Sequence, residues 1–244
     1  MTSFRRILAM ETRLYLRDPA AVLSTLGIPV VILVVLGLIP ALRKPNPDFD
    51  GQSFVAYFAP SLLVISLAVT GVNIMPQVLA GYRERGVLRR LSTTPVSPTA
   101  LLAAQLVLNV GVLLVSSALV VAVGRLAFGV ALPRQPLAFL LAFVLGAGSL
   151  LALGLLVAAV ARNGRAAGGL ATGLFALVMF FGGVYLPRFL LPDAVARIGD
   201  YTPPGVQALL DTWRGTSPDI LPLVIMALVA MLAGIAAARL FRWE

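Results

Sequence analysis

Six long stretches of the chain contain no charged side chain, and each has roughly the length that a helix needs to cross a membrane. An α-helix spans a hydrocarbon core about 30 Å thick with about 20 residues. Apolar runs of this length, separated by short charged segments, are typical of multi-pass membrane proteins. We therefore expect an all-α membrane protein whose residues 1–244 form a single transmembrane domain. Its six spans are predicted at residues 20–41, 53–79, 99–124, 137–160, 167–186 and 220–238.

Residues 1–19 differ from the apolar runs, because charged and apolar side chains recur there with helical spacing. The segment lacks the apolar core of a cleavable signal. The spacing predicts an amphipathic helix that lies at the membrane interface and ends at Asp18-Pro19, before the first span. Such a helix can be a plain anchor, a direct contact for a partner protein, or both. Its apolar face comprises Phe4, Ile7, Leu8, Leu14 and Tyr15.

Composition supports the membrane class and removes several kinds of chemistry. Of the 244 residues, 59% are hydrophobic and only 12% are charged, whereas about 25% are charged in soluble domains. The chain has no cysteine and no histidine, so disulfides, thiol nucleophiles, imidazole bases and the usual zinc sites are excluded. The net charge of +9 comes from arginines scattered between apolar runs. They form no continuous basic face, and we expect no nucleic-acid partner.

The arginines also predict an orientation. With the N-terminus in the cytoplasm, the inner segments hold 12 arginines and the outer segments hold seven basic residues. Because these segments are short, the excess of positive charge marks the cytoplasmic side. We expect a plasma (inner) membrane protein with both termini in the cytoplasm.

The segment 81–98 concentrates charge between the second and third spans. Pro95 prevents a helix from continuing, and Ser97 with Pro98 suits the start of the third span. The pattern predicts a short cytoplasmic helix on the membrane surface. It can be a polar turn whose arginines reach anionic lipid, or a docking site for another protein; about eighteen residues are more than a turn needs. Its charged residues are Arg83, Glu84, Arg85, Arg89 and Arg90.

The spans offer no group that would drive transport. They contain no carboxylate and no histidine, which proton-coupled and ion-coupled carriers require near the bilayer midplane. The phosphate-binding pattern G-x-x-x-x-G-K-[ST] is missing as well. A secondary carrier without a partner, or a membrane enzyme, remains the alternative, but Asp193, Asp200 and Asp211 are too dispersed to suggest a metal pair. Energy for uphill transport would have to come from another polypeptide.

Segment 187–219 contains five prolines and divides into two short helices, near 193–199 and 203–213. Neither can span a bilayer, so we expect them in the outer leaflet, with Thr202 as the N-cap of the second. The segment is either an ordinary outer loop or a gate on the exit side. Tyr185, Tyr201 and Trp213 are expected to be interfacial aromatics.

Four amides lie within the predicted spans: Asn73, Gln77, Gln105 and Asn109. An amide in hydrocarbon needs a partner, so these side chains either join helices or line a substrate path. At the start of the fifth span, the spacing of Gly164, Gly168, Gly169 and Gly173 favours close helix packing, within the subunit or across a dimer seam. With so few polar residues in the spans, a lipophilic or amphiphilic cargo is favoured over a sugar or an ion.

The sequence "YRERGVLRRLSTTPVSP" at 82–98 resembles the cytoplasmic loop of ABC-2 type (type-2 ABC) exporter permeases, in particular those of the daunorubicin- and multidrug-resistance class. The similarity extends over essentially the whole chain, including "YLPRFLLPDAVARIGDYTPPGVQALLDTWRG" at 185–215. Many relatives carry acidic or mixed charge where Arg89 and Arg90 stand, so the ion pairs with a partner do not carry over. The matching loop positions are Glu84, Arg85, Gly86, Val87, Leu88, Arg89, Arg90, Leu91, Thr94 and Pro95.

The resemblance implies a transport subunit that is not itself an enzyme and has no catalytic residue, metal site or cofactor of its own. Two copies of a separate ABC ATP-binding subunit would bind ATP and Mg. A second copy of the chain, or a related permease, would complete the membrane part among membrane lipids. The implied cargo is a drug, an antibiotic or a lipid, with lipid-linked polysaccharide as the alternative. The implied docking residues are Arg83, Glu84, Arg85, Gly86, Leu88, Arg89, Arg90 and Leu91.

Overall fold

The computed structural model describes residues 2–49, 51–87, 98–185 and 191–241, which form helices and no β-strand. Six helices in this part of the chain are long and apolar enough to cross a membrane, which confirms the predicted fold class. The spanning helices are Pro19–Leu38, Phe54–Glu84, Thr99–Phe128, Pro136–Val160, Gly164–Phe181 and Ile220–Leu240.

Several spans are built from more than one helical element. The first span is α2 (Pro19–Val22), the π-helix η1 (Leu23–Gly27) and α3 (Ile28–Leu38); the second is α4 (Phe54–Ala68), the π-helix η4 (Val69–Ile74) and α5 (Met75–Glu84). The remaining spans are α7 (Pro98–Phe128), α8 (Pro136–Val160), α9 (Gly164–Phe181) and α12 (Ile220–Leu240). Helices outside the spans are α1 (Thr2–Arg17), η2 (Pro40–Arg43), η3 (Pro47–Phe49), α10 (Asp193–Asp200) and α11 (Val206–Arg214).

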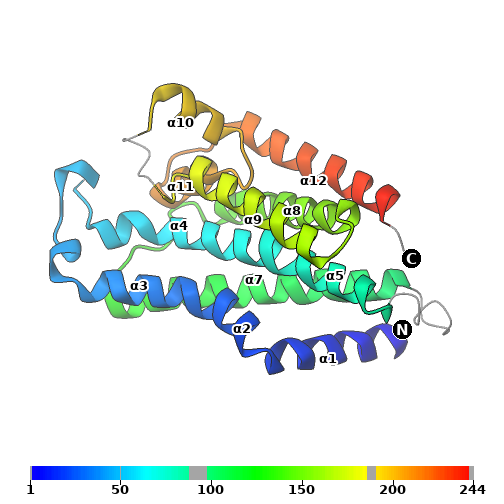
Figure 1. The fold of residues 1–244 in the computed structure, drawn as a ribbon. Coiled ribbons are helices and arrows are strands. Elements are labelled where there is room, and N and C mark those ends of the chain that lie inside the picture. Colours follow the sequence, from blue (N-terminus) through cyan, green and yellow to red (C-terminus); the bar gives the residue numbers. More distant parts are fainter. Residues whose placement is uncertain (1, 50, 88–97, 186–190, 242–244) are drawn as a thin grey trace.

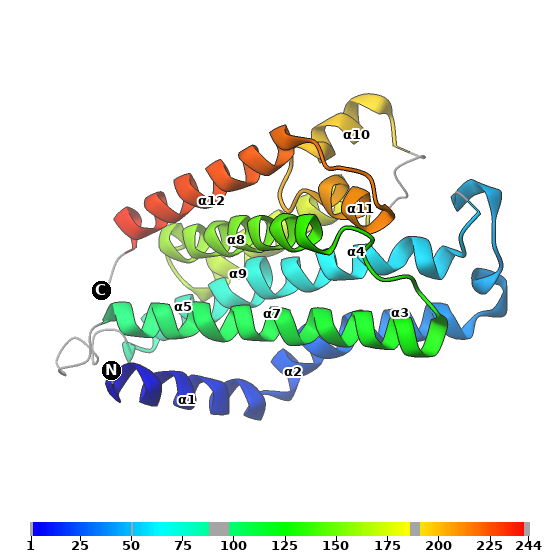
Figure 2. The same cartoon turned by 180° about the vertical axis from the view of Figure 1, so that it is seen from behind.

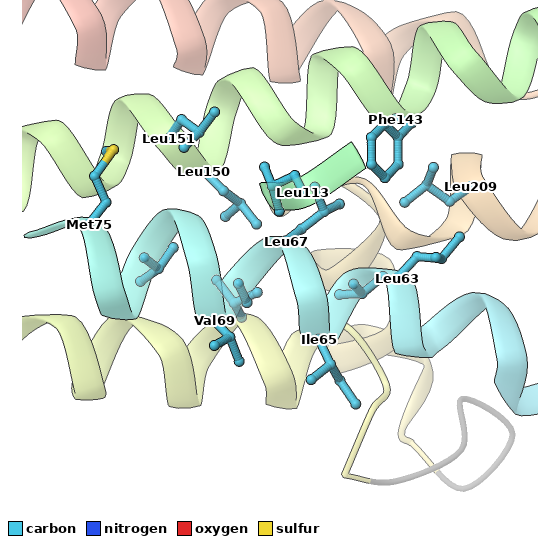
Figure 3. Packing of buried hydrophobic residues seen from close by; sticks show 14 of the residues in the cluster. Leu63, Ile65, Leu67, Val69, Met75, Leu113, Phe143, Leu150, Leu151 and Leu209 are labelled. Carbon is cyan, nitrogen blue, oxygen red and sulfur yellow. The ribbon is translucent and has the colours of Figure 1, made fainter. Parts of the chain in front are cut away.

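The second span forms the centre of the bundle. Its most apolar window is 83% buried, against 22–50% for the other five spans. Leu63 and Leu67 of α4 pack among side chains of α7, α8 and α11 (Figure 3). The second span and α8 approach each other tightly at two glycines, since a Cβ on Gly154 would clash with the Gly71 carbonyl oxygen. Small residues allow this approach of two backbones.

Both ends of the chain lie at one end of the bundle, beside the last turns of α5 and the first turns of α7 (Figures 1 and 2). We call this the terminal end. The short helices α10 and α11 lie at the opposite end (Figure 1). Because six spans bring the chain back to its starting side, this arrangement is the one that the predicted spans require.

The amphipathic pattern of residues 1–19 produces one helix and then a sharp break. Helix α1 ends at Arg17. Asp18 caps α2, because its Oδ1 accepts hydrogen bonds from the backbone N–H groups of Ala20 and Ala21 at 3.0 and 3.1 Å. Pro19 at the first helical position suits this start. The cap and Pro19 therefore mark where α1 ends and the first span begins.

Two predictions for the opposite end are wrong. The second short helix begins at Val206, capped by Gly205 in the left-handed conformation (φ 70°), while the Thr202 hydroxyl donates to the carbonyl oxygen of Ile198 in the preceding helix at 2.7 Å. Trp213 is not an interfacial side chain: it is 7% exposed, because α11 packs its apolar face against α8. Tyr185 and Tyr201, in contrast, are exposed.

Candidate functional site

The last turn of α5, which opens segment 81–98, is bound to the connection between α8 and α9. Glu84 accepts at Oε1 a hydrogen bond from the backbone N–H of Gly164 at 2.8 Å. A carboxylate is favourable at this position, where helix α9 begins. The neighbouring Arg83 donates to the carbonyl oxygen of Ala161, directly after α8. Two side chains of the predicted docking segment therefore bind another loop of the same chain.

The same turn is bound to α1 through Tyr82. Its hydroxyl donates to Oε2 of Glu11 at 2.6 Å, and Oε2 also accepts a hydrogen bond from Nε2 of Gln105 at 2.5 Å. Gln105 lies near the start of α7, where the chain returns from segment 81–98. One carboxylate oxygen thus joins α1 to the helices on both sides of this segment.

Glu11 is a buried carboxylate, with 3% of its surface exposed. Burial raises the pKa of its carboxyl group, because the charged form loses hydration, and the hydrogen bonds from Tyr82 and Gln105 act in the opposite direction. Within the described ranges no lysine or arginine forms an ion pair with it. Its two observed partners are neutral donors, which stabilise the ionised form less than a neighbouring cation would.

The chain turns sharply after this last turn of α5. Gly86 has a φ of 65°, a conformation that residues with a Cβ rarely adopt. Its N–H donates to the Arg83 carbonyl oxygen at 3.0 Å, and the N–H of Arg85 donates to that of Gly81 at 3.1 Å. The described start of segment 81–98 therefore continues the second span to Glu84 and then forms a turn at Arg85 and Gly86.

A model of the ABC-2 type transporter family matches residues 2–203 of the chain. The chain belongs to the ABC-2 type transporter family. It is therefore a transporter permease subunit and a multi-pass membrane protein. The matched residues include α1, segment 81–98 and the first five spans. No curated protein matches the permease with significant similarity.

The structure divides the four amides of the permease into two pairs. Asn109 donates at Nδ2 to the backbone oxygen of Gln105 at 2.8 Å and to its Oε1 at 3.4 Å, and both are buried. Gln77 donates at Nε2 to the Asn73 Oδ1 at 2.6 Å, and its side chain is exposed. The first pair extends the hydrogen bonds of Glu11 along α7. In the second pair, Asn73 and Gln77 meet part of their hydrogen-bonding capacity with each other, within the second span.

Of the remaining predicted docking residues, only Arg85 has a side chain that the structure describes. Arg85 is exposed and lies beside Tyr82. Four others, Leu88, Arg89, Arg90 and Leu91, lie outside the described residues.

Glu11 is the functional candidate that the sequence reasoning missed. A signal for it was present in the sequence of α1. Glu11 follows Ile7 by four residues and precedes Tyr15 by four, so it falls on the apolar face of the helix. An acidic residue on an apolar face is unfavourable unless it has a partner, and that pattern identifies it.

Proposed function

We propose that this ABC-2 permease is the membrane subunit of an ATP-driven exporter that moves a lipophilic or amphiphilic molecule outward. A separate ATP-binding subunit, in two copies, docks on segment 81–98. A second permease, either another copy of the chain or a relative, completes the membrane part in the plasma membrane. Both termini and segment 81–98 face the cytoplasm.

The observation that carries the proposal is the set of contacts made by the last turn of α5. Three consecutive side chains, Tyr82, Arg83 and Glu84, bind α1, the end of α8 and the start of α9, respectively. Force applied to the adjoining segment would reach several spans at once. A loop that only closed the gap between two spans would not need these contacts.

Helix α9 supports the second permease as a partner. A Cβ added at Gly169 or Gly173 would meet no atom within 4 Å, and the most apolar window of α9 is only 22% buried. Gly164 differs, because a Cβ there would lie 3.0 Å from Glu84 Oε2. The start of α9 is thus used within the chain, and its later turns present small residues outward.

Export that depends on both proteins tests the proposal. The permease and its ATP-binding subunit are reconstituted together in vesicles with a fluorescent lipophilic drug as cargo. We expect ATP-dependent movement of the drug only when both proteins are present. Vesicles with the ATP-binding subunit alone are the control, and transport by the permease alone would contradict the proposal.

Because the chain has no cysteine, single introduced cysteines test its orientation. Arg162→Cys lies between α8 and α9 at the terminal end, and Gln52→Cys lies at the opposite end; both positions are exposed. In intact cells, a membrane-impermeant maleimide should label Gln52→Cys and spare Arg162→Cys. Inside-out vesicles should give the reverse result, and a permeant maleimide should label both. The opposite labelling would place the predicted docking segment outside the cell.

A further inference from the structure

A pocket of about 480 Å³ lies near the terminal end, between the first span, α5 and α7. Glu11 and Tyr15 of α1 form one wall, and Asp18 lies where α1 meets the first span. Gln77 and Tyr82 face the pocket from α5. Three of the four amides of the spans border the same pocket, namely Gln77, Gln105 and Asn109.

The charges of the pocket favour a positive ligand. Two carboxylates border it, Glu11 and Asp18, and the single cation among its described lining residues is the exposed Arg85. Glu11 is buried, and its hydrogen-bond partners among the residues that the structure describes are neutral donors. A buried charge without an opposite charge is unfavourable, and a positive group in the pocket would compensate it.

The rest of the lining indicates what carries this positive charge. Leu14, Ile74, Val78 and Leu108 present apolar surface, and Tyr15 and Tyr82 add aromatic rings, whose faces attract cations. A metal ion would leave most of the 480 Å³ unfilled, and the described residues contain no group of three acidic side chains that could hold one. An organic cation with an apolar body matches both the size and the chemistry.

We propose that this pocket binds lipophilic organic cations from the cytoplasmic side, with the positive group near Glu11 and the apolar body against α5 and α7. The inference rests on the proposed function, because it names the class of cargo. It goes beyond that function by assigning a place on the chain where the cargo is held.

Two probes of matched shape test the charge preference directly. Tetraphenylphosphonium and tetraphenylborate present the same four phenyl groups around a positive and a negative centre, respectively. Binding is measured on the purified permease in neutral detergent, without the ATP-binding subunit. We expect the cation to bind at least about tenfold more tightly than the anion. The net charge of +9 favours non-specific binding of the anion over the cation. Equal or tighter binding of tetraphenylborate would overturn the proposal.

A variant of Glu11 tests where the preference arises. Glu11→Gln keeps an oxygen acceptor for Tyr82 and Gln105 but removes the charge. We expect it to weaken tetraphenylphosphonium binding about tenfold and to leave the anion unaffected. Asp193→Asn is the matched control, since it removes one negative charge from an exposed side chain of α10 at the opposite end. An equal loss of affinity in both variants would refute a local site.

A second pair of variants tests the space in the pocket instead of its charge. Gly81 borders the pocket, and a Cβ added to it would meet no atom within 4 Å. Gly81→Leu should therefore fold and should block tetraphenylphosphonium. Gly111→Leu on α7 also has open space around its Cβ but does not border the pocket, so binding should persist. Unchanged binding in Gly81→Leu would overturn the proposal even if Glu11→Gln failed to fold.

The failure of this inference can be separated from the failure of the proposed function. Binding of the cation without ATP-dependent export would contradict the exporter and retain the pocket. Export that continues in Gly81→Leu with unchanged cation affinity would contradict the pocket and retain the exporter.

Discussion

Gly86→Pro is expected to reduce ATP-driven export at least about tenfold while the ATP-binding subunit continues to hydrolyse ATP. Proline fixes φ near −65° and has no N–H, whereas Gly86 has a φ of 65° and donates its N–H to the Arg83 carbonyl oxygen at 3.0 Å. The turn at the start of segment 81–98 cannot form with proline. The segment would leave α5 in another direction, and its docked partner would no longer be connected to the last turn of that helix.

The matched control is Gly86→Asn, because asparagine tolerates the left-handed conformation better than other residues with a side chain. A Cβ at this position would meet no atom within 4 Å, so the comparison isolates the backbone. We expect near-normal export from Gly86→Asn and similar amounts of both variants in the membrane. Export and ATP hydrolysis are measured in the same vesicles. Normal export by Gly86→Pro would show that this turn does not transmit the motion.

The six spans could be predicted from the sequence because lipid leaves the chain few choices. A segment in hydrocarbon must satisfy its own backbone groups, and a long apolar helix does so. The predicted bounds of the spans were less accurate at the terminal end. The prediction ended the second span at residue 79, before its first charged residue, but the helix continues to Glu84. It continues because Arg83 and Glu84 have partners in the connection between α8 and α9.

The candidate site was predictable only in part, since its contacts join residues far apart in the sequence. Local spacing identified segment 81–98 and the polar amides. It could not show that Glu11 and Gln105, 94 positions apart, share a hydrogen bond. Trp213 illustrates the same limit at the opposite end. Its sequence context suits an interfacial side chain, yet its ring packs edge-on against Phe139 of α8, with centroids 5.5 Å apart.

Glu11→Ala is expected to destabilise the permease and to uncouple export from ATP hydrolysis. Alanine removes the acceptor shared by the Tyr82 hydroxyl and the Gln105 amide. A buried donor that loses its partner costs about 1–3 kcal/mol. Gln105 is buried and Tyr82 is partly buried, so the loss of both hydrogen bonds should lower the thermal unfolding temperature in detergent by several degrees. Because α1 would no longer be bound to α5 and α7, we also expect export to fall more than ATP hydrolysis.

A double-mutant cycle with Tyr82→Phe separates the hydrogen bond from other effects of the substitution. Phenylalanine removes the hydroxyl and preserves most of the packing. If the two side chains act through their 2.6 Å contact, the double variant should lose less stability than the two single variants together, with a coupling of about 0.5–3 kcal/mol. Strictly additive losses would show that the contact contributes nothing.

Glu11→Gln distinguishes the positioning role of Glu11 from its charge. The glutamine oxygen can accept the same hydrogen bonds, so this variant should retain most of the stability and coupling that Glu11→Ala loses. It should still lose the preference for the tetraphenylphosphonium cation, because its side chain is neutral. A stable, coupled Glu11→Gln permease without cation preference would mean that one side chain serves two purposes: its oxygen atoms hold α1 against the helices beside segment 81–98, and its charge selects the cargo. Loss of coupling in Glu11→Gln as severe as in Glu11→Ala would instead assign the coupling to the charge.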